Sequence, residues 1–280
     1  MPTPIRLEWL RRLYPGVNLL PEPAGSPPND APDDDHQIFV HDTLAAWDVC
    51  VDVVYTSEAY GTSLADQLGA DHREVDRARD AMPISGSEIR TDVHAHRQWL
   101  DPVVYAHFVD RIVLLGAEST GKTTLTQALA AHYDTAWIAE CGREVYEAHD
   151  GRLKPRHFVE ISRGHRLRED EALCQPGLHR YLFCDTNALT TAAFSYLMTG
   201  TALPEVLADA DACKERYARV LVCDDELPFE QDGWRANINV RAVHQRLLLY
   251  ELSIRGIVYQ MLTGSPEERL QQAIPYLESR

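Results

Sequence analysis

Short runs of apolar residues, separated by helix-length segments, recur through the second part of the chain. Five runs are predicted to be strands: RIVLLG (111–116), TAWIAE (135–140), RYLFCD (180–185), RVLVCD (219–224) and GIVYQML (256–262). Continuous apolar runs are typical of parallel strands that helices cover on both faces. The pattern therefore predicts an α/β fold with a five-stranded parallel sheet over residues 108–280.

The first part of the chain has a shorter and less regular pattern. It predicts helices near Ile5–Tyr14, up to Trp47 and at Thr62–Leu68, and strands at Val17–Leu20, Val49–Ser57 and His72–Val75. The stretch Pro21–Asp35 is rich in Pro, Gly and Asp and is predicted to be a mobile loop. We expect a partial α/β domain over residues 1–107, with the boundary near 107–110.

Composition and charge narrow the classes of partner. The 280 residues carry a net charge of −16, and the sequence contains no stripe of basic residues. This excludes typical nucleic-acid binding and attraction to anionic membranes, and leaves a small-molecule substrate. No apolar stretch is long enough to span a membrane, and the N-terminus lacks the pattern of a secretory signal. A homo-oligomer stays possible.

Six scattered cysteines form no C-x-x-C pair. Such usage is typical of reduced, mostly buried thiols, and it predicts a cytoplasmic protein without a disulfide framework or a zinc site.

Gly116 to Thr123, GAESTGKT, matches the phosphate-binding loop pattern G-x-x-x-x-G-K-[ST]. The loop follows an apolar run and precedes a predicted helix, so its amides would meet a phosphate at a helix N-terminus. Lys122 would bridge the β- and γ-oxygens of ATP, and the Thr123 hydroxyl would ligate Mg²⁺. The expected ATP contacts are Gly116, Glu118, Ser119, Thr120, Gly121, Lys122, Thr123 and Thr124.

Asp185 closes the third predicted strand of this sheet. A carboxylate at a strand end beside the phosphate loop is a typical second contact to Mg²⁺, and we expect this role. The alternative is an ordinary cap for the helix that begins near Asn187.

Glu140 and Arg143 follow the second predicted strand. We expect Glu140 to orient the acceptor hydroxyl or accept its proton, and Arg143 to hold the substrate or that carboxylate. The alternative is a surface ion pair between residues three apart.

Pro228–Arg235 combines turn residues with an arginine and precedes Arg241 and Arg246. The segment resembles a lid that closes on the triphosphate, with Arg235 as a catalytic residue and Arg241 as an ATP contact. Trp234 offers a flat surface for a cationic pyridine ring. The alternative is a solvated helix start; for Arg241 the two readings are balanced, and for Arg246 the alternative is favoured. The twelve histidines are interpreted as structural or surface residues.

Taken together, LLGAESTGKTTL, the E-x-x-R-E of Glu140–Glu144, FCDTNALTT and DDELPFEQDGWR resemble the kinase half of the bifunctional nicotinamide-mononucleotide adenylyltransferase/ribosylnicotinamide kinase family. The resemblance runs from about Arg111 to the C-terminus. Three positions depart from the family pattern: Asn187 and Glu226 stand where aspartates are expected, and Phe229 where a tryptophan is expected.

The first hundred residues resemble the trailing part of the adenylyltransferase half, through DVVYTSEAYGTSLADQLGA and PISGSEIRTD. In the latter, Ser85, Ser87 and Arg90 would form an anion site, or else a cap with a surface arginine. The family's H-x-G-H motif does not occur in this sequence. The resemblance therefore implies no adenylyltransferase activity for this chain.

The resemblance implies an ATP- and Mg²⁺-dependent kinase that converts nicotinamide riboside to nicotinamide mononucleotide in NAD biosynthesis. Lys122, Glu140, Asp185 and Arg235 would be its catalytic residues. Two alternatives remain open: a kinase for another nucleoside or nucleotide, and a non-catalytic ATP-binding sensor.

Overall fold

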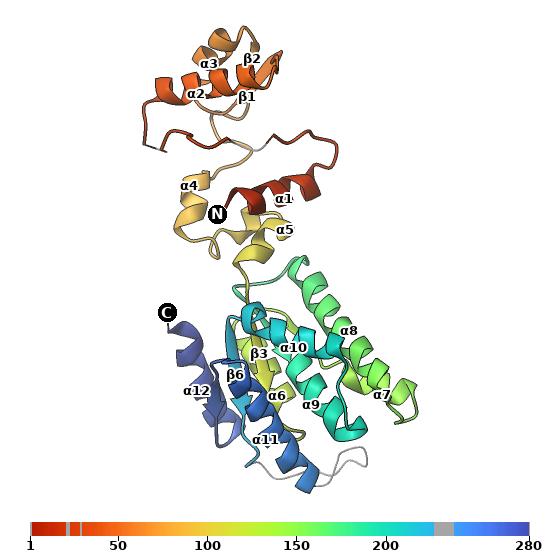
Figure 1. Ribbon diagram of the computed structural model, residues 1–280. Helices are drawn as coiled ribbons and strands as arrows, with labels where there is room; N and C mark the ends of the chain where they lie inside the picture. Colours follow the sequence, from red (N-terminus) through yellow and green to blue (C-terminus); the bar gives the residue numbers. More distant parts are fainter. Residues whose placement is uncertain (1, 21–22, 29, 227–237, 280) are drawn as a thin grey trace. The chain divides into compact units, whose positions relative to one another are not determined.

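The computed structural model describes residues 2–20, 23–28, 30–226 and 238–279. The chain divides into two compact units, Met1–Trp99 and Leu100–Arg280 (Figure 1). The division falls slightly before the boundary predicted near 107–110. Tyr105 shows why: it is buried, and its hydroxyl accepts a hydrogen bond of 3.0 Å from the Arg180 N–H in the second unit.

The first unit contains α1 (Thr3–Leu13), α2 (Asp33–Ala46), β1 (Val53–Thr56), α3 (Gly61–Leu68), β2 (Asp71–Glu74), α4 (Gly86–Thr91) and the 3-10 helix η1 (Arg97–Trp99). β1 and β2 pair in parallel, and α3 connects them. The side chain of Ser85 caps α4 and accepts a hydrogen bond from the Glu88 N–H. Arg90 donates to the Ser87 hydroxyl at 3.0 Å.

Two predictions for this unit are wrong. No strand forms at Val17–Leu20, where both terminal side chains are exposed and therefore gain nothing from a sheet. α2 begins at Asp33, inside the predicted loop, and three aspartates occupy its first turn. Acidic side chains stabilise a helix N-terminus through its dipole.

The second unit contains α5 (Pro102–Tyr105), the 3-10 helix η2 (Ala106–Phe108), β3 (Asp110–Leu115), α6 (Lys122–His132), β4 (Trp137–Ile138), α7 (Gly142–Ala148), α8 (Pro155–Leu173), β5 (Tyr181–Asp185), α9 (Ala188–Thr199), α10 (Pro204–Arg216), β6 (Arg219–Cys223), α11 (Ile238–Ile254), β7 (Gln260–Leu262) and α12 (Pro266–Glu278). The strands form one five-stranded sheet in the order β4-β5-β3-β6-β7, and every pair is parallel. The predicted α/β fold with a five-stranded parallel sheet is confirmed.

Alternate residues of the central strands face opposite layers of helices. Ile112 and Leu114 of β3 belong to one core cluster with Leu125 of α6 and Ala273 of α12. The intervening Val113 is also fully buried, as expected for a strand that has helices on both faces. The apolar runs of the sequence arise from this double burial.

The carboxyl ends of the strands bring the predicted site residues to one edge of the sheet. β3 lies between β5 and β6 and leads into the phosphate loop. Asp185 ends β5, Glu140 follows β4, and Asp224 follows β6. Because neighbouring parallel strands end at the same edge, these carboxylates surround the loop, where open α/β sheets bind ligands.

In the part of the chain that the structure describes, no helix combines the length and apolar character needed to cross a bilayer. All six cysteines are free thiols, and four of them are buried: Cys141, Cys184, Cys213 and Cys223.

Candidate functional site

The phosphate loop has the backbone geometry that its glycines permit. Gly116 has a φ of 145°, and a Cβ at this position would lie 2.6 Å from the Cys223 carbonyl oxygen. Gly121 has a φ of 80° and immediately precedes α6. Any larger residue at position 116 would collide with β6, so the loop can lie this close to the sheet only with glycine.

Side chains from within and outside the loop fix its shape. The Lys122 Nζ and the Thr120 hydroxyl both donate to the Ala117 carbonyl oxygen, each at 2.8 Å. The Ala117 N–H donates to Gln245 Oε1 on α11 at 2.7 Å. The ammonium group therefore lies over the loop, next to the N-terminus of α6, where a phosphate binds most readily.

Asp185 lies directly beside this loop. The Thr123 hydroxyl donates to Asp185 Oδ2 at 2.5 Å, which joins the two predicted Mg²⁺ ligands. The buried Oδ1 atom has no hydrogen-bond partner within the described residues. Two hard oxygen ligands with one free carboxylate oxygen fit Mg²⁺, which takes its other ligands from phosphates and water.

The alternative role of Asp185, as a helix cap, is wrong. Asn187 is the N-cap of α9, and its Oδ1 accepts a hydrogen bond of 3.0 Å from the Leu189 N–H. Asparagine and aspartate cap helices about equally well. This departure from the family pattern therefore preserves the local structure.

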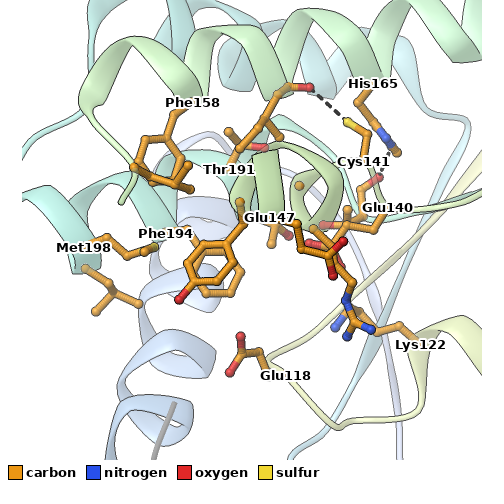
Figure 2. A pocket seen from close by; sticks show the side chains of 18 of the residues that line it. Glu118, Lys122, Glu140, Cys141, Glu147, Phe158, His165, Thr191, Phe194 and Met198 are labelled. Carbon is orange, nitrogen blue, oxygen red and sulfur yellow. Dashed lines mark hydrogen bonds between the residues drawn. The ribbon is translucent and has the colours of Figure 1, made fainter. Parts of the chain in front are cut away.

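A pocket of about 410 Å³ adjoins the phosphate loop (Figure 2). It brings together Glu118, Ser119, Lys122 and Thr123 from the loop and α6, and the acceptor candidates Glu140 and Arg143. Other lining residues come from α7, α8, α9 and α11: Tyr146, Glu147, Phe158, Ile161, His165, Thr190, Thr191, Phe194, Leu197, Met198 and Val240. Residues predicted from two separate motifs thus meet in one cavity.

The Glu140 side chain is accessible to solvent, but it lies inside the pocket, where protein atoms from the pocket walls surround it. This desolvation raises the pKa of its carboxyl group. The charge of Lys122 lowers the pKa, whereas the carboxylates of Asp185 and Glu118 raise it further. A carboxyl group with a raised pKa is suited to exchange a proton near neutral pH.

The raised pKa predicts that Glu140→Gln stabilises the protein above that pKa. The folded state binds the proton more tightly than the unfolded state, so stability falls as the pH rises through the folded pKa. Glutamine has no charge to desolvate, so Glu140→Gln avoids this loss of stability. Thermal unfolding midpoints of both proteins, measured from pH 4 to pH 8, test the prediction; they should diverge as the pH rises.

Glu144→Gln is the matched control, since Arg168 donates hydrogen bonds to this carboxylate and lowers its pKa. That ionised form stabilises the fold at neutral pH, so Glu144→Gln should lower the midpoint. A fall in the midpoint for both variants would contradict the predicted electrostatics of Glu140.

Two lining residues of the pocket, His165 and Tyr146, were not predicted from the sequence to belong to the site. His165 Nε2 donates to the Thr186 carbonyl oxygen at 2.8 Å. His244 of α11 is buried behind the pocket lining, against the lining residue Phe194, with ring centroids 4.1 Å apart. Burial and the charge of Lys122 lower the pKa of His244 to about 3, which keeps it neutral. No motif marks these histidines, because long-range packing alone brings α8 and α11 to the pocket.

Of the predicted lid, Phe229, Trp234 and Arg235 lie outside the described residues. Arg241 is 4% exposed and donates from Nη2 to the Ser119 carbonyl oxygen at 3.4 Å. It therefore contacts the phosphate loop, and a direct ATP contact stays a prediction. Arg246 is exposed on α11.

A family model described as an AAA domain, AAA_28, matches residues 111–269, more than half of the chain. The chain belongs to this AAA domain family. The matched range includes the phosphate loop, the acceptor candidates and Arg269 of α12.

The chain is also homologous to the trifunctional NAD biosynthesis/regulator protein NadR. It is 32% identical to NadR of Escherichia coli (strain K12) over 190 residues, which are 66% of this chain and 45% of the relative. NadR of Salmonella typhimurium (strain LT2) is 31% identical over 188 residues, again 45% of its length. The chain thus spans about half the length of the curated relatives it matches.

Two crystal structures of NadR have the same fold. NadR in complex with NR aligns with a TM-score of 0.69 and 21% identity over 99% of this chain and 82% of that one. NadR in complex with NAD and AMP-PNP aligns with a TM-score of 0.66 and 22% identity over 97% and 80%. The resemblance to the adenylyltransferase/ribosylnicotinamide kinase family is confirmed.

Proposed function

We propose that this protein transfers the γ-phosphate of ATP to the 5′-hydroxyl of nicotinamide riboside and forms nicotinamide mononucleotide for NAD synthesis. One observation carries the proposal: the pocket beside the phosphate loop combines carboxylates with aromatic walls. Such a pocket favours an acceptor that is both aromatic and positively charged.

The charge of the pocket points to a cation. Glu118, Glu140 and Glu147 line it, and their formal charge exceeds that of Lys122 and Arg143. Lys122 lies over the phosphate loop, so its charge serves the triphosphate. The acceptor side is left with an acidic lining, and a cation gains from it because charge interactions are stronger inside a protein than in water.

The apolar end of the pocket supplies a surface for a ring. Phe158, Phe194 and Met198 lie on one side of the view in Figure 2, and Glu140 and Lys122 on the other. Aromatic faces attract cations, and a cavity of about 410 Å³ is ample for a nucleoside. The pyridinium ring of nicotinamide riboside meets both requirements, and NadR was crystallised with NR.

The transfer follows from these positions. The 5′-oxygen attacks the γ-phosphorus, the bond to the β–γ bridging oxygen breaks, and ADP leaves, while the 5′-hydroxyl proton passes to Glu140. Lys122 and the loop amides hold the phosphates, and Thr123 and Asp185 would hold Mg²⁺. When bound, the ion neutralises charge on the phosphate oxygens.

We further propose that residues 1–107 form an adenylyltransferase-like domain and that the protein is cytoplasmic. A whole-chain alignment to NadR supports the first proposal.

The test is turnover of ATP with nicotinamide riboside and Mg²⁺, with nicotinamide mononucleotide followed by mass. The uncharged 1,4-dihydro form of the same riboside has nearly the same shape and is the matched control. We expect kcat/KM for the charged form to be at least tenfold higher, a difference of about 1.4 kcal/mol. A chelator should abolish turnover.

Glu118→Gln should reduce the preference for the charged riboside, because it removes one carboxylate from the acceptor side. Equal turnover of the two ribosides would contradict the electrostatic argument. Bound ATP without any turnover of nicotinamide riboside would contradict the proposed activity and favour another acceptor or a sensor.

A further inference from the structure

The wall of the pocket contains polar atoms that the protein itself does not satisfy. Thr186, Thr190 and His165 line the pocket and are 5%, 3% and 3% exposed, respectively. The hydroxyls of both threonines and the Nδ1 atom of His165 have no hydrogen-bond partner within the described residues. Buried polar groups are almost always hydrogen-bonded, and an unsatisfied one destabilises the fold.

Neighbouring hydroxyls on the same helix are satisfied. The Thr191 hydroxyl donates to the Asn187 carbonyl oxygen at 3.3 Å, and the Ser195 hydroxyl donates to the Thr201 carbonyl oxygen at 2.7 Å. The unsatisfied state is therefore specific to Thr190 within this stretch of α9. Thr190 and Thr191 both line the pocket, but only the Thr191 hydroxyl has a partner within the described protein.

The hydrogen bonds of His165 define what its free nitrogen can do. Its Nε2 lies 2.8 Å from the Thr186 carbonyl oxygen and 3.4 Å from Glu169 Oε1, and both atoms are acceptors. The proton therefore resides on Nε2. Burial lowers the pKa of His165 and favours the neutral ring, although Glu169 opposes this. Nδ1 is then an acceptor only, whereas a threonine hydroxyl can donate and accept.

These atoms together select a ligand group that donates and accepts hydrogen bonds. A hydroxyl does both. A carboxylate or phosphate only accepts, and it would face the lone pair of Nδ1 and the acidic side chain of Glu140. The chemistry therefore favours neutral hydroxyls, such as the vicinal pair of a ribose.

The sequence positions of these residues place them between the two ends of the pocket. Thr186 directly follows Asp185 at the phosphate end, and Thr190 lies one helical turn further on. Phe194 follows one turn later and belongs to the aromatic wall. An acceptor with its 5′-hydroxyl at Glu140 and its ring against that wall has its sugar at the level of Thr190.

We propose that Thr190 and His165 form a subsite that binds the 2′- and 3′-hydroxyls of the acceptor and selects ribosides over deoxyribosides. The inference rests on the proposed nucleoside kinase function and adds two specificity-determining residues to it. Thr190 would donate to or accept from one hydroxyl, and His165 Nδ1 would accept from the other.

Thr190→Val and Thr190→Ser form the matched pair for the test. Valine keeps the shape and removes the hydroxyl, whereas serine keeps the hydroxyl and removes a methyl group. The 280-residue chain is assayed with nicotinamide riboside and with its 2′-deoxy and 3′-deoxy analogues. We expect Thr190→Val to lower kcat/KM for the riboside about tenfold, the effect of one lost hydrogen bond. For the deoxy analogue that lacks the hydroxyl bound by Thr190, the same substitution should leave kcat/KM nearly unchanged.

Thermal stability separates this role from a structural one. Thr190→Val removes a hydroxyl that has no partner in the described protein, so its unfolding midpoint should equal or exceed that of the wild type. Thr190→Ser should keep the preference for the riboside and lose some stability. Loss of stability and uniform loss of activity in Thr190→Val would overturn the proposal.

His165 provides an independent pair. Glutamine can donate to the Thr186 carbonyl oxygen from the position of Nε2 and has no acceptor at the position of Nδ1. Asparagine has its amide near Nδ1 and cannot reach Thr186. His165→Gln should therefore reduce riboside preference about tenfold with little change in stability, and His165→Asn should chiefly reduce stability.

The proposed subsite would be overturned if Thr190→Val and His165→Gln both left the ratio of kcat/KM between riboside and deoxyriboside unchanged. That result would also be expected if water alone satisfied these polar atoms. Wild-type turnover is measured in the same series. Its absence would contradict the proposed function itself, so the two failures are distinguishable.

Discussion

Replacing Lys122 with alanine is expected to lower kcat about 10³-fold or more. Lys122 donates from Nζ to the Ala117 carbonyl oxygen at 2.8 Å, which places its charge over the phosphate loop. Phosphoryl transfer depends almost entirely on positioning and on charge stabilisation of the transferring group. Loss of one such donor from a preorganised site typically reduces kcat by about 10²–10³, and Lys122 also carries a full charge. Initial rates at saturating ATP and riboside measure the effect.

Lys214→Ala is the control, since this exposed lysine on α10 lies outside the pocket lining. It should keep wild-type kcat. Lys122→Ala should keep the wild-type circular dichroism spectrum, because the half-buried Lys122 side chain donates its hydrogen bond to its own loop, at Ala117. Near wild-type turnover in Lys122→Ala would remove the phosphate loop from the mechanism.

The sheet was predictable because its signal is local. Each central strand is buried on both faces, so its sequence is apolar throughout. The phosphate loop was predictable for a related reason: Gly116 lies so close to Cys223 that only glycine fits. Where burial or backbone geometry restricts the residue type at one position, the sequence alone carries the information.

The first unit illustrates the opposite case. Its predicted strand at Val17–Leu20 has the right residue types, yet it pairs with no other strand in the described structure. β-strand propensity depends on neighbours and burial more than on the backbone. The apolar pattern could not reveal that Val17 and Leu20 stay exposed.

The walls of the pocket were not predictable either. His165 and Thr190 lie on different helices, and neither belongs to a spacing motif. Their proposed role depends on the hydrogen bond from His165 to Thr186 and on polar atoms that have no partner within the described residues. Both features depend on how α8 and α9 pack. Glu140 was found from its place after a strand, but its raised pKa needed the surrounding charges.

Arg269 is the second residue whose replacement should have a large effect, and no motif in the sequence marks it. It is the largest fully buried side chain among the described residues, at 1% exposure. Its guanidinium forms an ion pair with Asp224 and donates to the Thr120 carbonyl oxygen at 2.5 Å and to the Gly264 carbonyl oxygen at 2.9 Å. It thus joins α12 to the end of β6 and to the phosphate loop.

Replacing Arg269 with methionine is expected to lower the free energy of unfolding by about 3–5 kcal/mol. Methionine fills most of the volume but leaves the Asp224 carboxylate buried without its cation and the Thr120 carbonyl without its donor. Denaturant titrations of the two proteins measure the difference. ATP affinity should also fall in the folded fraction, because the loop loses one of its supports.

Two further variants test the cause. Arg163→Met, at an exposed position on α8, should change stability by no more than about 0.5 kcal/mol. Adding Asp224→Leu to Arg269→Met should recover part of the loss, since removing both charges of a buried pair costs less than removing one. A double variant that is less stable than Arg269→Met would contradict this explanation. Packing, and not charge, would then explain the role of Arg269.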